Sequence, residues 1–124
     1  MSGERVYTVE EANAMLPDLR SRLARIREAR DVVIETSELV KGRVAADGGG
    51  VAGSPRYFEA ARTLRSELEH LAALEIVLRD PHTGLVDLLG EVDGRRVWLC
   101  WRADEDRVGH YHELDAGFTG RRPL

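Results

Sequence analysis

The sequence predicts an α+β domain in which a long antiparallel helical hairpin, preceded by a short N-terminal helix, packs on a three-stranded antiparallel β-meander. Apolar residues recur every three or four positions until about residue 79 and every second position from residue 85. The dipeptide Asp93-Gly94 between alternating segments is a strong hairpin signal. A chain of 124 residues with 43% hydrophobic residues has the size of one domain. We therefore expect a single domain over residues 1–124, divided into a helical hairpin at 9–79, a β-meander at 85–114 and a C-terminal tail at 115–124.

The first two helices are predicted from a capping motif and a proline. Thr8 and Glu11 have the spacing of a capping box, so a helix should begin at residue 9. Pro17 disfavours helical backbone at Leu16 but suits the first turn of a helix, which predicts a break after residue 15. The next helix should run to about Val44. Its buried stripe is predicted to contain Leu16, Leu19, Leu23, Ile26, Arg30, Val33, Ser37 and Val40.

The second arm of the hairpin should follow a flexible glycine-rich loop at residues 45–54. Ser54 and Pro55 are typical of a helix N-cap and first turn. Two long helices joined by one loop are expected to lie antiparallel, with Arg30 and Glu75 reaching to the edge of the seam. The predicted stripe of this helix contains Tyr57, Ala61, Leu64, Leu68, Leu71, Glu75 and Leu78.

Two strands, 85–92 and 95–102, are predicted on either side of the Asp93-Gly94 turn. A two-residue turn places Val92 opposite Arg95 and so determines the register of every other pair. The face that should cover the helices pairs Gly90 with Val97, Leu88 with Leu99 and Val86 with Trp101. The other face pairs Glu91 with Arg96, Leu89 with Trp98, Asp87 with Cys100 and Leu85 with Arg102. A third strand is expected at Arg107–Leu114, with Val108, His110, His112 and Leu114 on one side and Tyr111 on the other.

The candidate site depends on the register of that third strand. With a loop of odd length, Asp87, Cys100, His110 and His112 share the sheet face turned away from the helices. With a loop of even length, the histidines lie on the opposite side from Cys100. A thiolate, a carboxylate and imidazoles are ligands of a divalent transition metal such as zinc or iron. Alternatively, Cys100 is an inert buried thiol and the histidines are surface or interface residues.

A catalytic cysteine is a further alternative, in which Arg102 and a histidine stabilise a thiolate. It is weaker than the metal hypothesis, because nucleophilic cysteines usually occupy helix N-termini or strained turns. The apolar side chains of Leu85, Leu89 and Trp98 on the outer face favour a homodimer or higher homo-oligomer. The main alternative function is therefore a non-catalytic interaction module.

Charge and composition argue against several classes of protein. A net charge of −4 does not favour general nucleic-acid binding. The arginine cluster at Arg20–Arg30 keeps nucleic-acid contact as a minor alternative, although acidic residues are interleaved with it. No uncharged apolar run approaches the length of a membrane span, and the N-terminus shows no signal-peptide pattern. Cys100 is the only cysteine, so we expect a reducing compartment, the cytoplasm.

Several short motifs resemble the small bacterial family of domain of unknown function 2203. They are Tyr7-Thr8, Glu10-Glu11-Ala12-Asn13, Leu16-Pro17, Gly84-Leu85-Val86-Asp87, Leu99-Cys100-Trp101, Tyr111-His112-Glu113, Gly117-Phe118 and Gly120-Arg121. The resemblance implies a cytoplasmic bacterial protein and brings no established activity. Its pattern matches Asp87, Cys100, Trp101, His112, Glu113 and Arg121, whereas His110 departs from it and Tyr111 stands where tryptophan is more frequent.

Two residue sets follow as expectations for the site. A small ligand should meet Asp87, Cys100, Trp98, Arg102, Glu113 and Arg121. A metal ion should meet Asp87, Cys100, His112 and His110, with the first three favoured by the family pattern.

Overall fold

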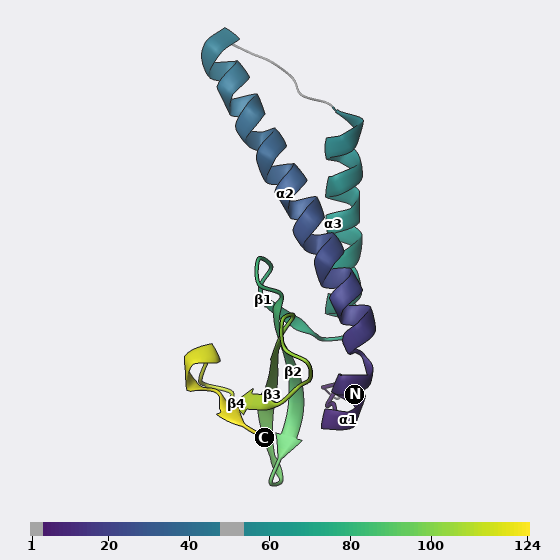
Figure 1. The fold of residues 1–124 in the computed structure, drawn as a ribbon, viewed down its shortest axis with the longest axis vertical. Helices are drawn as coiled ribbons and strands as arrows, with labels where there is room; N and C mark the ends of the chain where they lie inside the picture. The colour runs from purple at the N-terminus through teal and green to yellow at the C-terminus, as the bar shows by residue number, and fades with distance from the viewer. Residues whose placement is uncertain (1–3, 48–53) are drawn as a thin grey trace.

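The structure, a computed structural model, describes residues 4–47 and 54–124 and confirms the α+β class. Two long helices lie side by side, and an antiparallel sheet packs near one end of the pair (Figure 1). The helices are α1 (Val9–Ala14), α2 (Leu16–Asp47) and α3 (Pro55–Ala73), and a 3-10 helix, η1, covers Phe118–Gly120. The strands are β1 (Val77–Asp80), β2 (Leu85–Val92), β3 (Arg95–Arg102), β4 (His110–His112) and β5 (Arg122–Pro123).

The helix caps are those that the sequence predicts. The Thr8 hydroxyl accepts from the Glu11 amide at 3.0 Å, and the Glu11 carboxylate accepts from the Thr8 amide at 2.8 Å. α1 ends before Met15, and α2 begins directly after it. The Ser54 hydroxyl caps α3 through the Tyr57 amide. Of the loop predicted at 45–54, residues 45–47 belong to α2 and residues 48–53 lie outside the described residues.

The seam between α2 and α3 follows the predicted stripe only in part. Leu16, Leu19, Leu23 and Ile26 are buried as expected, but the seam then moves to Ala29 and Val32. The steps of three residues from Leu23 to Val32 are shorter than the 3.6-residue turn, so the buried stripe rotates about the helix axis instead of keeping the three-four spacing. On α3 the buried positions are Ala60, Glu67 and Leu71, with Leu64 partly buried, while Leu68 is 40% exposed.

Arginines from the predicted cluster bind within the protein. Arg22 and Arg25 donate to the buried Glu67 carboxylate at 2.8 and 3.0 Å. Arg20 donates to the backbone carbonyls of Glu105 and Asp106, at 2.7 and 3.1 Å. These contacts connect the two helices to each other and to the loop after β3. Nucleic-acid contact through this helix stays a prediction.

The predicted end of the second long helix was wrong. α3 ends at Ala73, and residues 77–80 form the edge strand β1. The Ile76 amide donates to the Leu71 carbonyl at 3.0 Å and the Glu75 amide to the Ala72 carbonyl at 3.0 Å, the bonds of a Schellman cap. Glu75 occupies the left-handed position, with φ of 59°. The sequence did not indicate this helix end, because the left-handed position after a helix is usually occupied by glycine and not by glutamate.

The sheet has five strands in the order β1-β2-β3-β4-β5, with antiparallel neighbours, so the predicted three-stranded meander was incomplete. β5 comes from the predicted C-terminal tail and pairs with β4. The tight turn is confirmed by φ angles of 52° at Asp93 and 78° at Gly94. The predicted register of β2 and β3 is confirmed at each of its pairs.

The third strand is shorter than predicted and covers His110–His112 only. Upstream of it, the Val108 amide donates to the Asn13 side chain at 2.8 Å rather than to a neighbouring strand. Val108 is buried in the core below the helices, not on the histidine side, and Leu114 is exposed. The bond to α1 therefore removes this segment from the sheet and turns Val108 inward.

The main core lies between the helical hairpin and one face of the sheet. Val86, Leu88, Val97, Leu99 and Trp101 are fully buried there. They belong to one cluster with the apolar residues at the start of α2. No helix within residues 4–47 and 54–124 combines the length and apolar content needed to cross a membrane.

Gly90 tests how closely this core is packed. A Cβ atom at Gly90 would lie 2.5 Å from Leu99 Cγ, so we expect Gly90→Ala to lower the free energy of unfolding by about 1 to 3 kcal/mol. Gly117→Ala is the matched control, because a Cβ atom there has no neighbour within 4 Å in the described residues. Urea unfolding followed by circular dichroism measures both. Equal stability of the two variants would contradict this packing.

Candidate functional site

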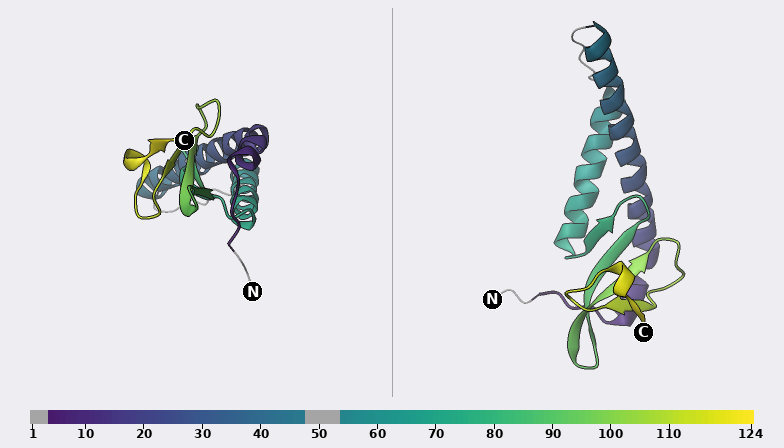
Figure 2. Two further views of the ribbon diagram at one scale, coloured as in Figure 1. Left: turned by 90° about the horizontal axis from the view of Figure 1, so that it is seen from below. Right: turned by 90° about the vertical axis from the view of Figure 1, so that its left-hand side faces the viewer.

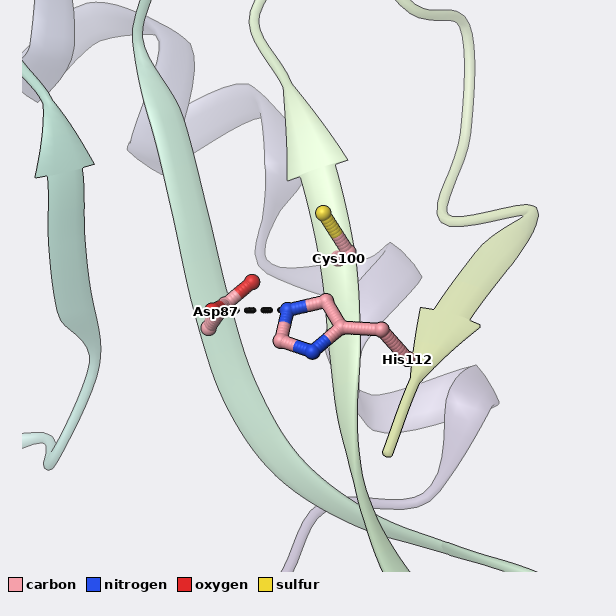
Figure 3. Close-up of side chains that lie close together, drawn as sticks. All are labelled: Asp87, Cys100 and His112. Carbon is pink, nitrogen blue, oxygen red and sulfur yellow. Dashed lines mark hydrogen bonds and ion pairs between the residues drawn. The ribbon is translucent and has the colours of Figure 1, made fainter. Parts of the chain in front are cut away.

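Strand register brings the predicted site residues to one sheet face. Asp87 pairs with Cys100, Cys100 pairs with His110, and Trp98 pairs with His112. The structure therefore has the arrangement expected for the odd-length loop. Figure 3 shows Asp87 on β2, Cys100 on β3 and His112 on β4 converging from three neighbouring strands. One ligand atom from each lies within 4.8 Å of the other two, and His110 is outside this group.

The Asp87, Cys100 and His112 cluster is buried, although the sequence predicts an outward-facing surface. The three residues are 1%, 1% and 2% exposed. Arg79 from β1 donates to Asp87 Oδ2 at 2.8 Å, and Arg121 from the C-terminal segment lies 3.9 Å from Cys100 Sγ. The expectation of an open face was wrong because β1 and the C-terminal segment, which cover the site, were predicted as helix and tail.

Hydrogen bonds determine the orientation of the His112 ring. Nδ1 lies 2.9 Å from the Glu113 carbonyl oxygen, which can only accept, so Nδ1 must carry a hydrogen. Nε2 lies 3.0 Å from Asp87 Oδ2. In the neutral ring Nε2 is then an acceptor facing another acceptor. The contact is favourable only with a proton on one of the two atoms or with a cation beside them, and a backbone carbonyl on the other ring nitrogen is typical of metal-binding histidines.

Asp87 keeps one oxygen without a partner. Oδ2 accepts from Arg79 and faces His112, whereas buried Oδ1 has no hydrogen-bond partner within the described residues. Leaving a carboxylate oxygen buried and unpaired costs about 1 to 3 kcal/mol or more. Such an atom inside a group of three ligand-type side chains is an available electron-pair donor.

Cys100 is held as a neutral thiol. Burial raises its pKa to about 11, the nearby Asp87 charge adds to that effect, and the Arg121 guanidinium opposes it. Because the thiolate is the nucleophile, this shift argues against a cysteine that reacts at neutral pH. A bound cation would release the proton, since metals bind the thiolate.

Arg121 is itself firmly positioned. It forms a two-pronged ion pair with Glu105, and its guanidinium carbon lies 4.4 Å from the centre of the Phe118 ring. The same ion pair lowers the pKa of Glu105. The Glu105 carboxylate also accepts from the Arg102 amide at 2.9 Å, which connects the C-terminal segment to the end of β3.

The remaining predicted ligand-binding residues lie outside the central group. Arg102 pairs with Asp104 at 2.7 Å, and Glu113 pairs with Arg95 at 2.7 Å. The Arg79 guanidinium carbon lies over the Trp98 ring, 5.3 Å from the centre of that ring. Sequence reasoning missed Arg79 and Glu105. The alternation in Val77-Leu78-Arg79-Asp80 could have indicated a strand with Arg79 on the site face, but the helical pattern before it was extended instead.

The donor set fits a divalent transition metal. Imidazole nitrogen, thiolate sulfur and carboxylate oxygen all bind zinc, and iron accepts the same types. In a tetrahedral zinc site, ligand atoms lie roughly 3.3 to 3.8 Å apart, so the group, whose ligand atoms lie within 4.8 Å of one another, would close slightly around an ion. The orphaned Asp87 Oδ1 and the tautomer of His112 are both consistent with such an ion.

The fold and site define a class of small α+β proteins with a buried carboxylate, thiol and imidazole behind an arginine-covered sheet face. The chain belongs to the family DUF2203, described as an uncharacterized conserved protein, whose model matches residues 5–124. That description assigns no activity. No curated protein and no solved structure shows significant similarity to the chain.

The raised pKa of Cys100 predicts a specific loss of stability in alkali. The unfolded chain loses the thiol proton near pH 9 and the folded protein near pH 11, so the favourable contribution is complete below pH 9 and disappears toward pH 11. We expect the stability difference between the wild type and Cys100→Ser to shrink over this interval. Urea unfolding in EDTA at a series of pH values measures it. A constant difference would contradict a buried neutral thiol.

Proposed function

We propose that the protein binds a divalent transition metal, zinc or iron, through Asp87, Cys100 and His112. The observation that carries this proposal is the convergence of three ligand atoms within 4.8 Å in a buried group, one of them on a side chain with an orphaned oxygen. Three protein ligands leave one coordination position of a tetrahedral ion for a small ligand. The protein is thus proposed to be a metal-dependent binder of a small molecule, with Trp98, Arg102 and Arg121 as the surroundings from which that molecule approaches. Glu113 is held away from this group by its ion pair with Arg95.

Charge balance supports this assignment. The Asp87 carboxylate and the Cys100 thiolate together compensate the two charges of the ion. Arg79 and Arg121 place positive charge near the same group, but Arg121 is paired with Glu105 and Arg79 binds the Oδ2 atom of Asp87. Oδ1 is then the carboxylate atom available to the metal. Each arginine would also orient one of the metal-binding side chains, Arg79 that of Asp87 and Arg121 that of Cys100. Hydrogen-bond partners of metal ligands have this role in other metal sites.

The proposed setting is the bacterial cytoplasm. A thiol ligand must stay reduced to bind metal, and a single cysteine avoids competing disulfides within the chain. Metal content should therefore be measured on protein produced in the cytoplasm, where the thiol stays reduced.

Metal content tests the proposal directly. Protein purified without an affinity tag should contain close to one zinc or iron per chain by mass spectrometry of the metal. His112→Asn and Cys100→Ser should each lower that content at least about tenfold, because loss of a ligand removes a principal bond to the ion. Circular dichroism checks that both variants are folded.

His110→Asn is the matched control. His110 lies opposite Cys100 on the same face but outside the group of three, so its loss should leave the metal content unchanged. Wild-type protein that stays metal-free after incubation with zinc or ferrous iron contradicts the proposal. Equal metal in the His112 and His110 variants also contradicts it.

Metal affinity should depend on pH in a defined direction. Binding must displace the Cys100 proton, whose pKa of about 11 lies far above neutrality. The association constant for zinc should therefore rise by about tenfold per pH unit between roughly pH 6 and pH 8, with release of at least one proton. Competition with a chromophoric chelator measures the slope. An affinity independent of pH would exclude thiolate ligation.

A further inference from the structure

The helical hairpin has two grooves between α2 and α3 with different chemistry. One is lined largely by polar side chains, among them Arg25, Glu28, Arg56 and Glu59. The other is lined by apolar side chains, Val33, Ala61, Leu64, Leu68 and Ala72, with Arg65 and Glu69 at its rim. Both helices continue beyond the sheet, which packs only near one end of the pair (Figure 2). The apolar groove is therefore a surface that the sheet does not cover.

α3 carries more apolar surface than one seam requires. Its buried seam runs through Ala60, Leu64, Glu67 and Leu71. A second stripe at three-four spacing, Phe58, Ala61, Arg65, Leu68 and Ala72, lies beside that seam, and its last four members line the apolar groove. Phe58 is 54% exposed and Leu68 is 40% exposed. Two adjacent apolar stripes on one helix are typical of a helix that contacts two partners.

We propose that the apolar groove is the contact surface between two copies of this chain, with their α3 helices antiparallel about a two-fold axis near residue 67. The proposal is independent of the metal site and concerns a different face of the molecule. A two-fold interface uses the same patch on both copies, so the patch must complement itself in shape and in charge.

Rim charges of α3 meet this requirement. About an axis near residue 67, Arg65 faces Glu69 of the partner subunit, and Glu69 faces Arg65 of the partner subunit. Both residues are exposed, and neither forms an ion pair within the described part of the chain. A parallel arrangement would instead bring like charges together, which is unfavourable. The charge pattern thus favours a second copy, in one orientation.

Apolar residues complement each other about the same axis. Leu68 lies one residue from the axis, so the two copies of Leu68 are offset by about 3 Å along the helices, given a rise of 1.5 Å per residue. Leu64 is then a neighbour of Leu68 of the partner subunit. Such an offset lets side chains interdigitate, as in four-helix bundles.

Sedimentation equilibrium of the full chain in EDTA tests the interface separately from metal binding. We expect a dimer mass that dissociates on dilution. Leu68→Glu should weaken dimerisation at least about tenfold, because it places a charge at the centre of the contact. As Leu68 is partly exposed in one chain, the variant should retain its circular dichroism. Leu114→Glu is the matched control: Leu114 is 51% exposed but follows β4, and its loss should leave the mass unchanged.

A charge exchange tests the orientation. Arg65→Glu and Glu69→Arg should each weaken the dimer, and the double variant should recover most of the wild-type affinity, since it restores opposite charges across the axis. A monomer at every concentration would overturn the proposal. A dimer unaffected by Leu68→Glu, or a double variant no tighter than the single variants, would overturn it as well.

Discussion

The pairing of β2 with β3 at the Asp93-Gly94 turn is the constraint on which the candidate site depends. A two-residue turn allows one register, and that register places Asp87 directly across from Cys100. A shift of either strand by one residue would turn the side chain of that strand, Asp87 or Cys100, into the core under the helices. The apolar partners on the other face, from Val86 to Trp101, oppose such a shift because all of them are buried. Packing energy on one side of the sheet thus holds the polar group on the other.

Burial of that polar group comes from the two edges of the sheet. β1 brings Arg79 over Asp87, and the segment leading to β5 brings Arg121 over Cys100. Both arginine side chains are partly exposed to solvent on their outer sides. They shield the buried Asp87 carboxylate and Cys100 thiol from water in place of an apolar side chain. The site combines low solvent access with nearby positive charge. Low solvent access keeps the proton on the Cys100 thiol, against the opposing effect of the Arg121 charge, and leaves one Asp87 carboxylate oxygen without a partner.

The two proposals use separate parts of the molecule. The proposed metal group lies in the sheet, on the face turned away from the helices, and the proposed dimer contact lies on the helical hairpin. The main core, to which the start of α2 and the inner face of the sheet contribute, lies between the two regions. Two copies joined through α3 would leave each metal group within its own chain, so ligand binding at one site would need no residue from the other copy.

Local signals in the sequence determined much of this protein. The capping box at Thr8, the break before Pro17, the cap at Ser54 and the turn at Asp93-Gly94 depend on short-range chemistry, and each lies where it was expected. The β2 and β3 register follows from the turn alone, and with it the Asp87 and Cys100 pair. Only tertiary structure decided the rest. α3 ends at a glutamate in a left-handed conformation, Val108 leaves the sheet for a bond to Asn13, and His112 meets Asp87 through the register of a strand without a tight turn. These outcomes depend on contacts between residues that are distant in the chain. The free energies of such contacts cannot be inferred from a local sequence pattern.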